Sequence, residues 1–528
     1  MNASPGHDAV VIGAGHNGLV CAAYLARAGR RVLVLEASES VGGCAVSGEI
    51  HPGYAVSTCA HILHLLHPEV IADLRLKRHG LALSAPDLAT LALLPGGDHL
   101  LLSSEDQATR ESISRFSRRD AERLPGFRAR LERFAGALRP FLMATPPRLA
   151  NGTWRDRLTM IRLGIAIRRL GRADMRELLR IVGICSADLV EDVFESDALK
   201  GVLAFDSVLG SFLGPRSPSS AFNLLYRAAG ESDGRRGALS HPKGGMGAVT
   251  AALAAAAKGF GAEVRTAAPV AKIAVEDAVA TGVVLESGEE IAARTVVSNA
   301  DPRRTFLDLV GPDQLDTDFV RRVRHIRMNG ATAKVNLALD GLPDLGGLGP
   351  HMANARLLIA PGVDYIEHAF DDAKYGAFSA EPAMEITIPS LNDPSLVPEG
   401  GHVMSIVVQF APYRLKDGGW AAHREAFGDH VLETLAAYMP DLSGRVLARQ
   451  IVTPDDLERD FRVSGGHWHH GELILNQLFM LRPVPRFAQY RAPIDNLYLC
   501  GAGAHPGGGI MGAAGRNAAR EIMRDWSR

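Results

Sequence analysis

The sequence predicts an α/β fold in which a Rossmann-like nucleotide-binding domain, assembled from discontinuous segments, carries an inserted α+β domain. Three observations predict this fold. An apolar strand, a glycine-rich turn and a helix open the chain. The same three features close it. The 528 residues are too many for a single hydrophobic core, so we expect a further domain between the two units.

The first unit is predicted to be a βαβ unit. Residues 8–12 (DAVVI) form a short apolar run, typical of a buried parallel strand. A helix is expected over residues 17–28, and a second strand over residues 31–35 (RVLVL). The turn between the first strand and the helix therefore lies where a nucleotide-binding loop lies in this kind of unit.

That turn has the sequence GAGHNG, a GxGxxG motif. Gly13 allows the tight turn, Gly15 lets a pyrophosphate approach the backbone, and Gly18 lets the helix pack on the strand. Glu36 ends the second strand, where its carboxylate can bond ribose hydroxyls and disfavours a 2′-phosphate. The alternative is a glycine turn without a ligand, which this context makes the weaker interpretation. The motif predicts a bound dinucleotide.

The middle of the chain divides into helical and mixed stretches. Residues 104–235 are predicted to be mostly helical, and residues 248–258 form an alanine-rich helix. Strand-like segments follow at 263–265, 282–286 and 295–298. We therefore expect two domains, the nucleotide-binding one from residues 1–103, 236–312 and 484–528, and the substrate domain from residues 104–235 and 313–483.

The last unit favours FAD over NAD. Residues 497–500 form a strand, followed by a glycine-rich turn and a helix. This turn could hold the ribityl chain and the flavin ring, and Gly42 and Gly43, just past Glu36, suit close passage of an extended dinucleotide. A loop that is glycine-rich only for tight packing is the alternative. The expected cofactor contacts in the turn are Gly501, Gly503, Gly509, Met511 and Gly512.

The chain resembles the FAD-dependent phytoene desaturase and carotenoid isomerase superfamily, and within it the pyridine nucleotide-disulfide oxidoreductase domain-containing protein 2 family. The resemblance rests on matching stretches across nearly the whole chain: VVIGAGHNGLVCAAYLARAG, EIHPGY, KGGMGAVTAALA, VVSNADP, IPSLNDPSLVPEGGHV, LNQLFMLRPVP and LYLCGAGAHPGGGIMGAAGRNAA. It implies non-covalent FAD, the two-domain fold of flavin amine oxidases, an apolar or amine substrate, and Val270 at the adenine. Two departures are Cys44, where many desaturases have arginine, and Ala502, where related flavoproteins have an acid.

Three functions follow from this resemblance. The first is an FAD oxidoreductase that takes hydride from an apolar or lipid-like substrate to the flavin, and the second is an amine oxidase that acts on a C–N bond. The third is a prenyl-binding escort protein without FAD, which the intact residues Gly13, Gly15, Gly18 and Glu36 disfavour. No second GxGxxG follows a strand, so the expected electron acceptor is oxygen, a quinone or another carrier.

Two histidines are candidate catalytic residues, His470 by the resemblance and His505 because it lies in the flavin-side turn. The alternative is a histidine that bonds the backbone. His61, His64 and His67 recur every three residues and could line one helix face, but no carboxylate or cysteine spacing supports a metal site, and none is expected.

Composition limits the partners and the compartment. The net charge of −2 and pI of about 6.8 give no reason to expect nucleic acid. Five scattered cysteines disfavour a disulfide framework, a zinc site and dithiol redox chemistry. Only seven residues precede the first strand, and no apolar run is long enough to span a membrane. We expect a cytoplasmic protein, or a processed one of the mitochondrial matrix if its source is a eukaryote.

A basic helix is expected over residues 154–180. Arg155, Arg162, Arg169 and Arg176 repeat every seven residues, near one helix face. Such a helix could lie on an anionic membrane surface. Apolar residues at 161 and 165 fall inside the arginine arc, however, which favours an ordinary solvated helix.

Overall fold

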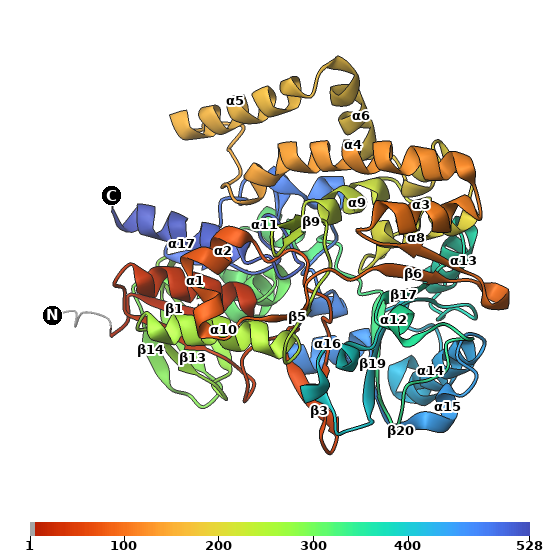
Figure 1. The fold of residues 1–528 in the computed structure, drawn as a ribbon. Helices are drawn as coiled ribbons and strands as arrows, with labels where there is room; N and C mark the ends of the chain where they lie inside the picture. The colour runs from red at the N-terminus through yellow and green to blue at the C-terminus, as the bar shows by residue number, and fades with distance from the viewer. Residues whose placement is uncertain (1–5, 528) are drawn as a thin grey trace.

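A parallel five-stranded sheet and a mixed seven-stranded sheet organise the computed structural model, which describes residues 6–527 (Figure 1). The parallel sheet has the order β11-β2-β1-β15-β21. Its strands come from distant stretches of the chain, which confirms the predicted assembly from discontinuous segments. They are β1 (Ala9–Ile12), β2 (Val32–Leu35), β11 (Glu263–Arg265), β15 (Val296–Ser298) and β21 (Leu497–Leu499).

Three helices cover this sheet. They are α1 (His16–Arg27), α10 (Met246–Gly259) and α17 (Ala513–Trp526), and α1 packs against both of the others. The abundance of alanine and glycine in these helices allows the close approach, because small side chains let helix backbones come together. All five strands are almost completely buried, as expected for a parallel sheet, apart from the edge strand β11.

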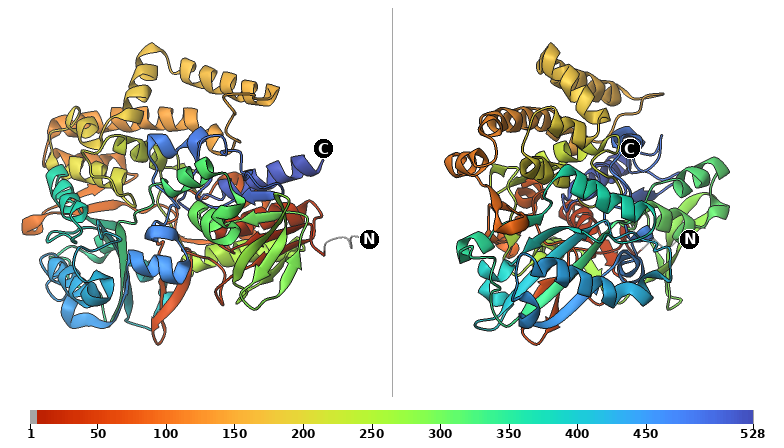
Figure 2. Two further views of the ribbon diagram at one scale, coloured as in Figure 1. Left: turned by 180° about the vertical axis from the view of Figure 1, so that it is seen from behind. Right: turned by 90° about the vertical axis from the view of Figure 1, so that its right-hand side faces the viewer.

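A small antiparallel sheet extends the nucleotide-binding domain. Its strands β12 (Val270–Glu276), β13 (Val279–Leu285) and β14 (Glu290–Ala292) pair in that order and appear in green at the lower right of the left-hand view in Figure 2. Of these three strands, the sequence pattern indicates only the middle one. Strand β12 matters for the site because it begins at Val270.

The seven-stranded sheet forms the second domain and has the order β20-β16-β19-β18-β17-β6-β7. Two of its strands precede residue 103, where the sequence placed the domain boundary, so this boundary differs from the strand pairing. Strand periodicity alone could not show which sheet these residues join. The strands are β6 (Thr90–Leu93), β7 (His99–Leu102), β16 (Thr332–Leu339), β17 (Arg356–Ile359), β18 (Ala383–Thr387), β19 (His402–Gln409) and β20 (Val446–Val452).

The stretch from 104 to 235 is mostly helical, as predicted, but the expected basic helix is broken. Gly171 adopts φ of 85° between α5 and α6, so Arg176 lies on a different helix from Arg155, Arg162 and Arg169. The helices are α3 (Asp106–Ser114), α4 (Arg118–Leu142), α5 (Trp154–Arg169), α6 (Arg172–Gly183), α7 (Ser186–Glu191), α8 (Asp197–Val208) and α9 (Ser220–Ala228). Within residues 6–527, no helix has both the length and the apolar composition needed to cross a bilayer.

Short elements connect the two domains. The hairpin of β3 (Ser47–His51) and β4 (Tyr54–Ser57) reaches from the nucleotide-binding domain to β19 and β20. The other elements are α2 (Pro68–Asp73), β5 (Leu83–Ala85), β8 (Glu231–Ser232), β9 (Arg235–Arg236), β10 (His241–Pro242), α11 (Thr317–Arg324), α12 (Pro350–Ala353), α13 (Val363–Lys374), α14 (Gly419–Ala436), α15 (Leu442–Arg445) and α16 (Pro454–Phe461).

The expected helix carrying His61, His64 and His67 is not formed. This segment is non-helical, and Leu63 bridges to Ser240 across it. His67 instead precedes α2 and accepts a hydrogen bond from the Glu69 amide, which makes it the N-cap. The spacing of three was therefore coincidental.

Candidate cofactor and substrate site

The cofactor cavity lies at the carboxyl end of the parallel strands, where nucleotides bind in open α/β sheets. We use this name for the cavity whose wall includes the loop after β1, the end of β2 and the start of β12. Many of the residues singled out from the sequence come together in its wall: Gly13, Gly15, Glu36, Gly42, Gly43, Val270 and His470.

The loop after β1 presents bare backbone to this cavity. Gly13 and Gly42 have φ of 91° and 134°, in a region that favours glycine. Gly15 forms a backbone bridge with Gly42, and a Cβ atom on Gly15 would lie 2.8 Å from the Asn299 side-chain nitrogen. Glycine at these positions therefore leaves room for a ligand to approach the main chain closely.

Glu36 is fixed in place by two backbone amides. The Ala14 amide donates to Oε2 at 2.7 Å and the Ser38 amide donates to Oε1 at 2.9 Å. A carboxylate has about four acceptor sites, so both oxygens keep capacity for ribose hydroxyls. The side chain is buried at the end of β2, which orients it toward the cavity.

Unsatisfied polar groups around the cavity provide a test of whether a dinucleotide fits. Helix α1 begins after Gly15 with no side-chain cap and no acid in its first turn, so its first amides remain available for a pyrophosphate. Buried polar atoms of four lining residues also have no partner within residues 6–527. They are His16 Nε2, Asn17 Oδ1, Trp468 Nε1 and His470 Nδ1. The residues present therefore fit a dinucleotide.

Three of the predicted cofactor glycines serve packing in the structure. A Cβ on Gly18 would lie 2.1 Å from the Gly13 carbonyl oxygen, so the helix can approach the loop only without a side chain. A Cβ on Gly501 would lie 2.4 Å from the Asn299 carbonyl oxygen, and one on Gly503 2.3 Å from Pro302 Cδ. None of the three lines the cavity, and direct contact of Gly501 and Gly503 with flavin stays a prediction.

The rest of the C-terminal turn differs from expectation. Gly509 and Ile510 line the neighbouring cavity, whereas the Met511 side chain is buried in the hydrophobic core. Ile510 has φ of 57°, and this left-handed residue reverses the direction in which successive side chains point. Gly512, with φ of 75°, is the N-cap of α17. The side chain nearest this cavity is thus that of Ile510 rather than Met511.

The two candidate catalytic histidines have different environments. His505 Nε2 lies 2.8 Å from the Phe141 carbonyl oxygen, and the residue lines neither cavity, so its expected position at the site is wrong. His470 lines the cofactor cavity, and burial lowers its pKa to about 4. His470 is therefore neutral near pH 7 and can exchange hydrogen bonds without bringing a positive charge.

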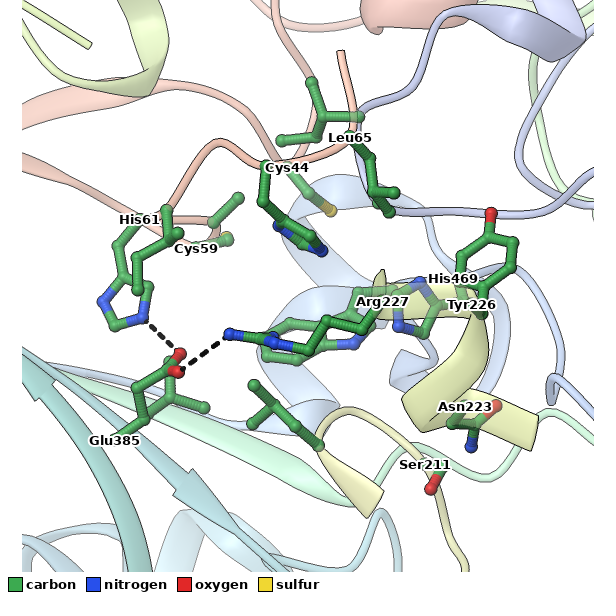
Figure 3. Close-up of a pocket in the computed structure, with 18 of the residues that line it drawn as sticks. Cys44, Cys59, His61, Leu65, Ser211, Asn223, Tyr226, Arg227, Glu385 and His469 are labelled. Carbon is green, nitrogen blue, oxygen red and sulfur yellow. Dashed lines mark hydrogen bonds and ion pairs between the residues drawn. The ribbon is translucent and has the colours of Figure 1, made fainter. Parts of the chain in front are cut away.

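A second cavity, which we call the substrate cavity, adjoins the first (Figure 3). His16, Cys44 and Trp468 line both cavities, so the two meet beside the nucleotide-binding loop. Most of its wall is apolar. The apolar lining residues are Ala45, Ala60, Ile62, Leu65, Leu209, Val407, Leu473 and Ile510.

One end of the substrate cavity is charged. Figure 3 shows Glu385 between His61 and Arg227, with Nε2 of His61 at 2.9 Å and Nη2 of Arg227 at 3.9 Å from its carboxylate oxygens. Arg356 also pairs with Glu385 and lies 2.5 Å from Asp206. Burial alone would raise the pKa of Glu385, but Arg356 and His61 outweigh it and hold that pKa well below its usual range. The carboxylate is therefore ionised.

Lys334 is a buried residue that the sequence analysis missed. It lies on β16, and its amino group has no hydrogen-bond partner within residues 6–527. Burial lowers its pKa to about 7, opposed by the charges of Cys59 and Glu385, two residues of the substrate cavity. A lysine inside the apolar run ATAKVNLAL was the signal that could have found it.

Cysteines far apart in sequence meet at this site. The β3–β4 hairpin brings Cys44 beside Cys59, since the Ala60 amide donates to the Cys44 carbonyl at 3.1 Å. The hydrogen bond with Cys44, together with burial, raises the pKa of the Cys59 thiol. Spacing alone did not reveal this pair, but a protonated buried thiol is a poor nucleophile. No group of three metal-ligating side chains is arranged to hold a metal within residues 6–527.

Comparison with known proteins identifies relatives along the whole chain. The family model described as flavin containing amine oxidoreductase matches residues 18–523. Pyridine nucleotide-disulfide oxidoreductase domain-containing protein 2 from Mus musculus is 40% identical over 548 residues, which cover 99% of this chain and 94% of its own. One of the subunits of limonene dehydrogenase from Castellaniella defragrans is 27% identical, with 98% and 94% covered.

The fold is also shared with solved structures. A variant of putrescine oxidase superposes with a TM-score of 0.62 at 15% sequence identity, and 99% of each chain is covered. This likeness concerns the fold, and it agrees with the two-domain architecture described above. The resemblance expected from the sequence motifs is confirmed.

Proposed function

Because the chain belongs to the flavin-containing amine oxidoreductase family and is an FAD-dependent oxidoreductase, we propose that it dehydrogenates an apolar or lipid-like organic substrate. The observation that carries this proposal is the apolar substrate cavity that meets the cofactor cavity at His16, Cys44 and Trp468. The similarity to part of a limonene dehydrogenase supports the same substrate class.

The residues of the chain hold the cofactor and shape the reaction space. Glu36, the first amides of α1 and Val270 would bind the FAD, and bound FAD supplies an acceptor for hydride. Apolar side chains such as Ile62 and Val407 exclude water from the neighbouring space. Removal of a hydride requires no strong acid, which agrees with the lowered pKa values of His470 and His61, both near 4.

Oxidation of an amine is the second candidate, and the fold shared with putrescine oxidase favours it. The buried, unpartnered amino group of Lys334 also shows that the site tolerates an amine of lowered pKa. Against this candidate, the aromatic residues of the substrate cavity are Tyr226 and Trp468, and ring contacts in residues 6–527 do not join them. An amine clamp of two facing rings is therefore not what the cavity offers.

A substrate panel with a matched pair of variants tests the proposal. The FAD-loaded protein is mixed anaerobically with polyenes, terpenes and acyl chains, and separately with methylated amines, while the flavin absorbance is followed. We expect bleaching by the apolar set. Leu209→Trp, inside the substrate cavity, should slow that bleaching at unchanged FAD content, whereas Leu475→Trp at an exposed position should not. Bleaching by amines alone would refute the apolar assignment.

A further inference from the structure

Helix α5 stands apart from the body of the protein, above α4 (Figures 1 and 2). Its packing partners among the helices are α4 and α6. We propose that the outer face of α5 docks the protein on an anionic membrane surface.

The outer face carries an apolar stripe. Trp154, Ile161 and Ile165 are 67%, 57% and 46% exposed. Their spacings of seven and four residues place them on one side of a helix, and the half-buried Leu158 lies between them. Leu149, just before the helix, is exposed as well. Exposed large apolar side chains gathered on one helix mark a contact surface more often than scattered ones do.

Arginines border this stripe on both sides. Arg155, Arg162 and Arg169 lie seven residues apart and form one row, and Arg157 and Arg168, eleven apart, form the opposite row. None of these five side chains forms an ion pair within residues 6–527. The whole chain has a net charge of −2, so five unpaired arginines on a helix of 16 residues are a local accumulation.

The single acid of α5 points away from this face. Asp156 is buried, completes a capping box with Thr153, and accepts hydrogen bonds from the Arg148 amide at 3.1 Å and from Gln489 at 2.9 Å. These bonds tie the first turn of the helix to the C-terminal part of the chain. They also hold the arginine rows and the stripe on the solvent side. The sequence pattern places Ile161 and Ile165 inside an arginine arc, and in three dimensions that arc is two rows around a narrow stripe.

The charge pattern favours a lipid surface over a second copy of the chain. Two copies that paired through α5 would bring arginine rows together, which is unfavourable. Lipid phosphates accept bidentate hydrogen bonds from arginine on both sides of the stripe. Tryptophan and isoleucine then enter the headgroup region, as in other interfacial helices.

Vesicle flotation with the full-length, FAD-loaded protein tests this proposal. We expect the protein to float with vesicles of phosphatidylcholine and phosphatidylglycerol, less with phosphatidylcholine alone, and less at high salt. Trp154→Ser/Ile161→Ser/Ile165→Ser and Arg157→Gln/Arg162→Gln/Arg168→Gln should each reduce the bound fraction on anionic vesicles at least about tenfold. Tyr375→Ser/Leu447→Ser, at positions 78% and 45% exposed elsewhere, should bind like the wild type.

The FAD content of each variant reports whether it is folded, and Trp154→Ser alone replaces the triple variant if that variant loses its FAD. The proposal is overturned if the wild type does not float with anionic vesicles, or if the stripe variants float equally well. It is also overturned if light scattering shows a stable dimer that the stripe variants abolish, since the face would then join two copies. Flotation does not depend on the substrate, so it separates this proposal from the proposed function.

Discussion

Individual residues of the cofactor cavity could be predicted from local sequence, whereas the charged end of the substrate cavity could not. Gly13, Gly15 and Glu36 follow a strand–turn–helix pattern within about 30 residues, and such a pattern fixes their relative positions. His61, Arg227 and Glu385 come from three distant stretches and meet only through tertiary packing. No local period encodes that meeting, which is why sequence reasoning overlooked it.

Replacement of Glu36 by glutamine should weaken FAD binding. Both carboxylate oxygens of Glu36 accept backbone amides, and an amide side chain would turn a donor toward one of them. We expect the FAD dissociation constant to rise roughly 10- to 100-fold, since hydrogen bonds to charged groups are worth about 1.5–3 kcal/mol. Titration of apo-protein with FAD, followed by flavin fluorescence, measures this change.

The matched control is Glu39→Gln. Glu39 lies three residues further on, is exposed and does not line the cofactor cavity. Its amide variant should bind FAD like the wild type. An equal loss in both variants would mean that the effect comes from net charge rather than from the position of Glu36.

Lys334 makes stability depend on pH. Its pKa falls from 10.5 to about 7 on folding, so the unfolded chain binds the additional proton between these values. The cost of burying the charge is complete below about pH 7 and disappears above about pH 10.5. Lys334→Met should therefore stabilise the protein near pH 6, by up to a few kcal/mol at about 1.4 kcal/mol per pKa unit. The gain should shrink as the pH rises.

Urea unfolding of the two FAD-saturated proteins at several pH values checks this prediction. The difference in the free energy of unfolding should decrease steadily from about pH 7 to pH 10. A lysine that stabilises the fold through its charge would give the opposite sign, with Lys334→Met less stable at low pH.

At the scale of whole elements, the strongly patterned ones were predicted and the ambiguous ones were not. Strands β1 and β2, helix α1 and helix α17 have the expected type and nearly the expected bounds. The segment from His61 to His67 was misread because a spacing of three is not specific to helices. Strands β6 and β7 were assigned to the wrong side of a boundary, because strand pairing is a long-range property.

The contact between α1 and the loop after β1 depends on Gly18. In Gly18→Ala, the added Cβ would lie 2.1 Å from the Gly13 carbonyl oxygen, which belongs to backbone and cannot move cheaply. We expect a loss of about 1–3 kcal/mol in the free energy of unfolding and a lower FAD content. Thermal unfolding and the ratio of flavin to protein absorbance measure the two effects.

Gly126→Ala, in helix α4, is the control because its Cβ would meet no atom within 4 Å. It should be neutral or stabilising by up to about 1 kcal/mol. If both substitutions are equally harmless, then the helix is not held close to the loop by the missing side chain.

At the scale of the whole molecule, two adjoining cavities assign the cofactor and the substrate to separate domains. The parallel sheet supplies the loop and Glu36, and the seven-stranded sheet supplies Glu385 and Lys334. The fold class and the FAD could be predicted because each depends on repeated local signals. The composition of the substrate cavity could not, since its lining residues come from stretches that run from residue 16 to residue 510.

Flavin should leave the protein when it is precipitated with acid. The structure places Cys44 in the wall of the cofactor cavity, so a covalent link through its sulfur is the alternative to examine. We predict that all flavin appears in the supernatant, in the wild type and in Cys44→Ala alike. Flavin retained in the wild-type precipitate and released from Cys44→Ala would show a covalent link.

Anaerobic mixing with reductants tests most directly whether an organic substrate in the second cavity reduces the FAD. A nicotinamide would need its own binding unit, and no second GxGxxG follows a strand in the sequence. We predict that NADH and NADPH leave the long-wavelength flavin absorbance unchanged during the time in which an apolar substrate bleaches it. Rapid bleaching by NADH or NADPH would contradict this prediction and would reverse the direction of electron flow.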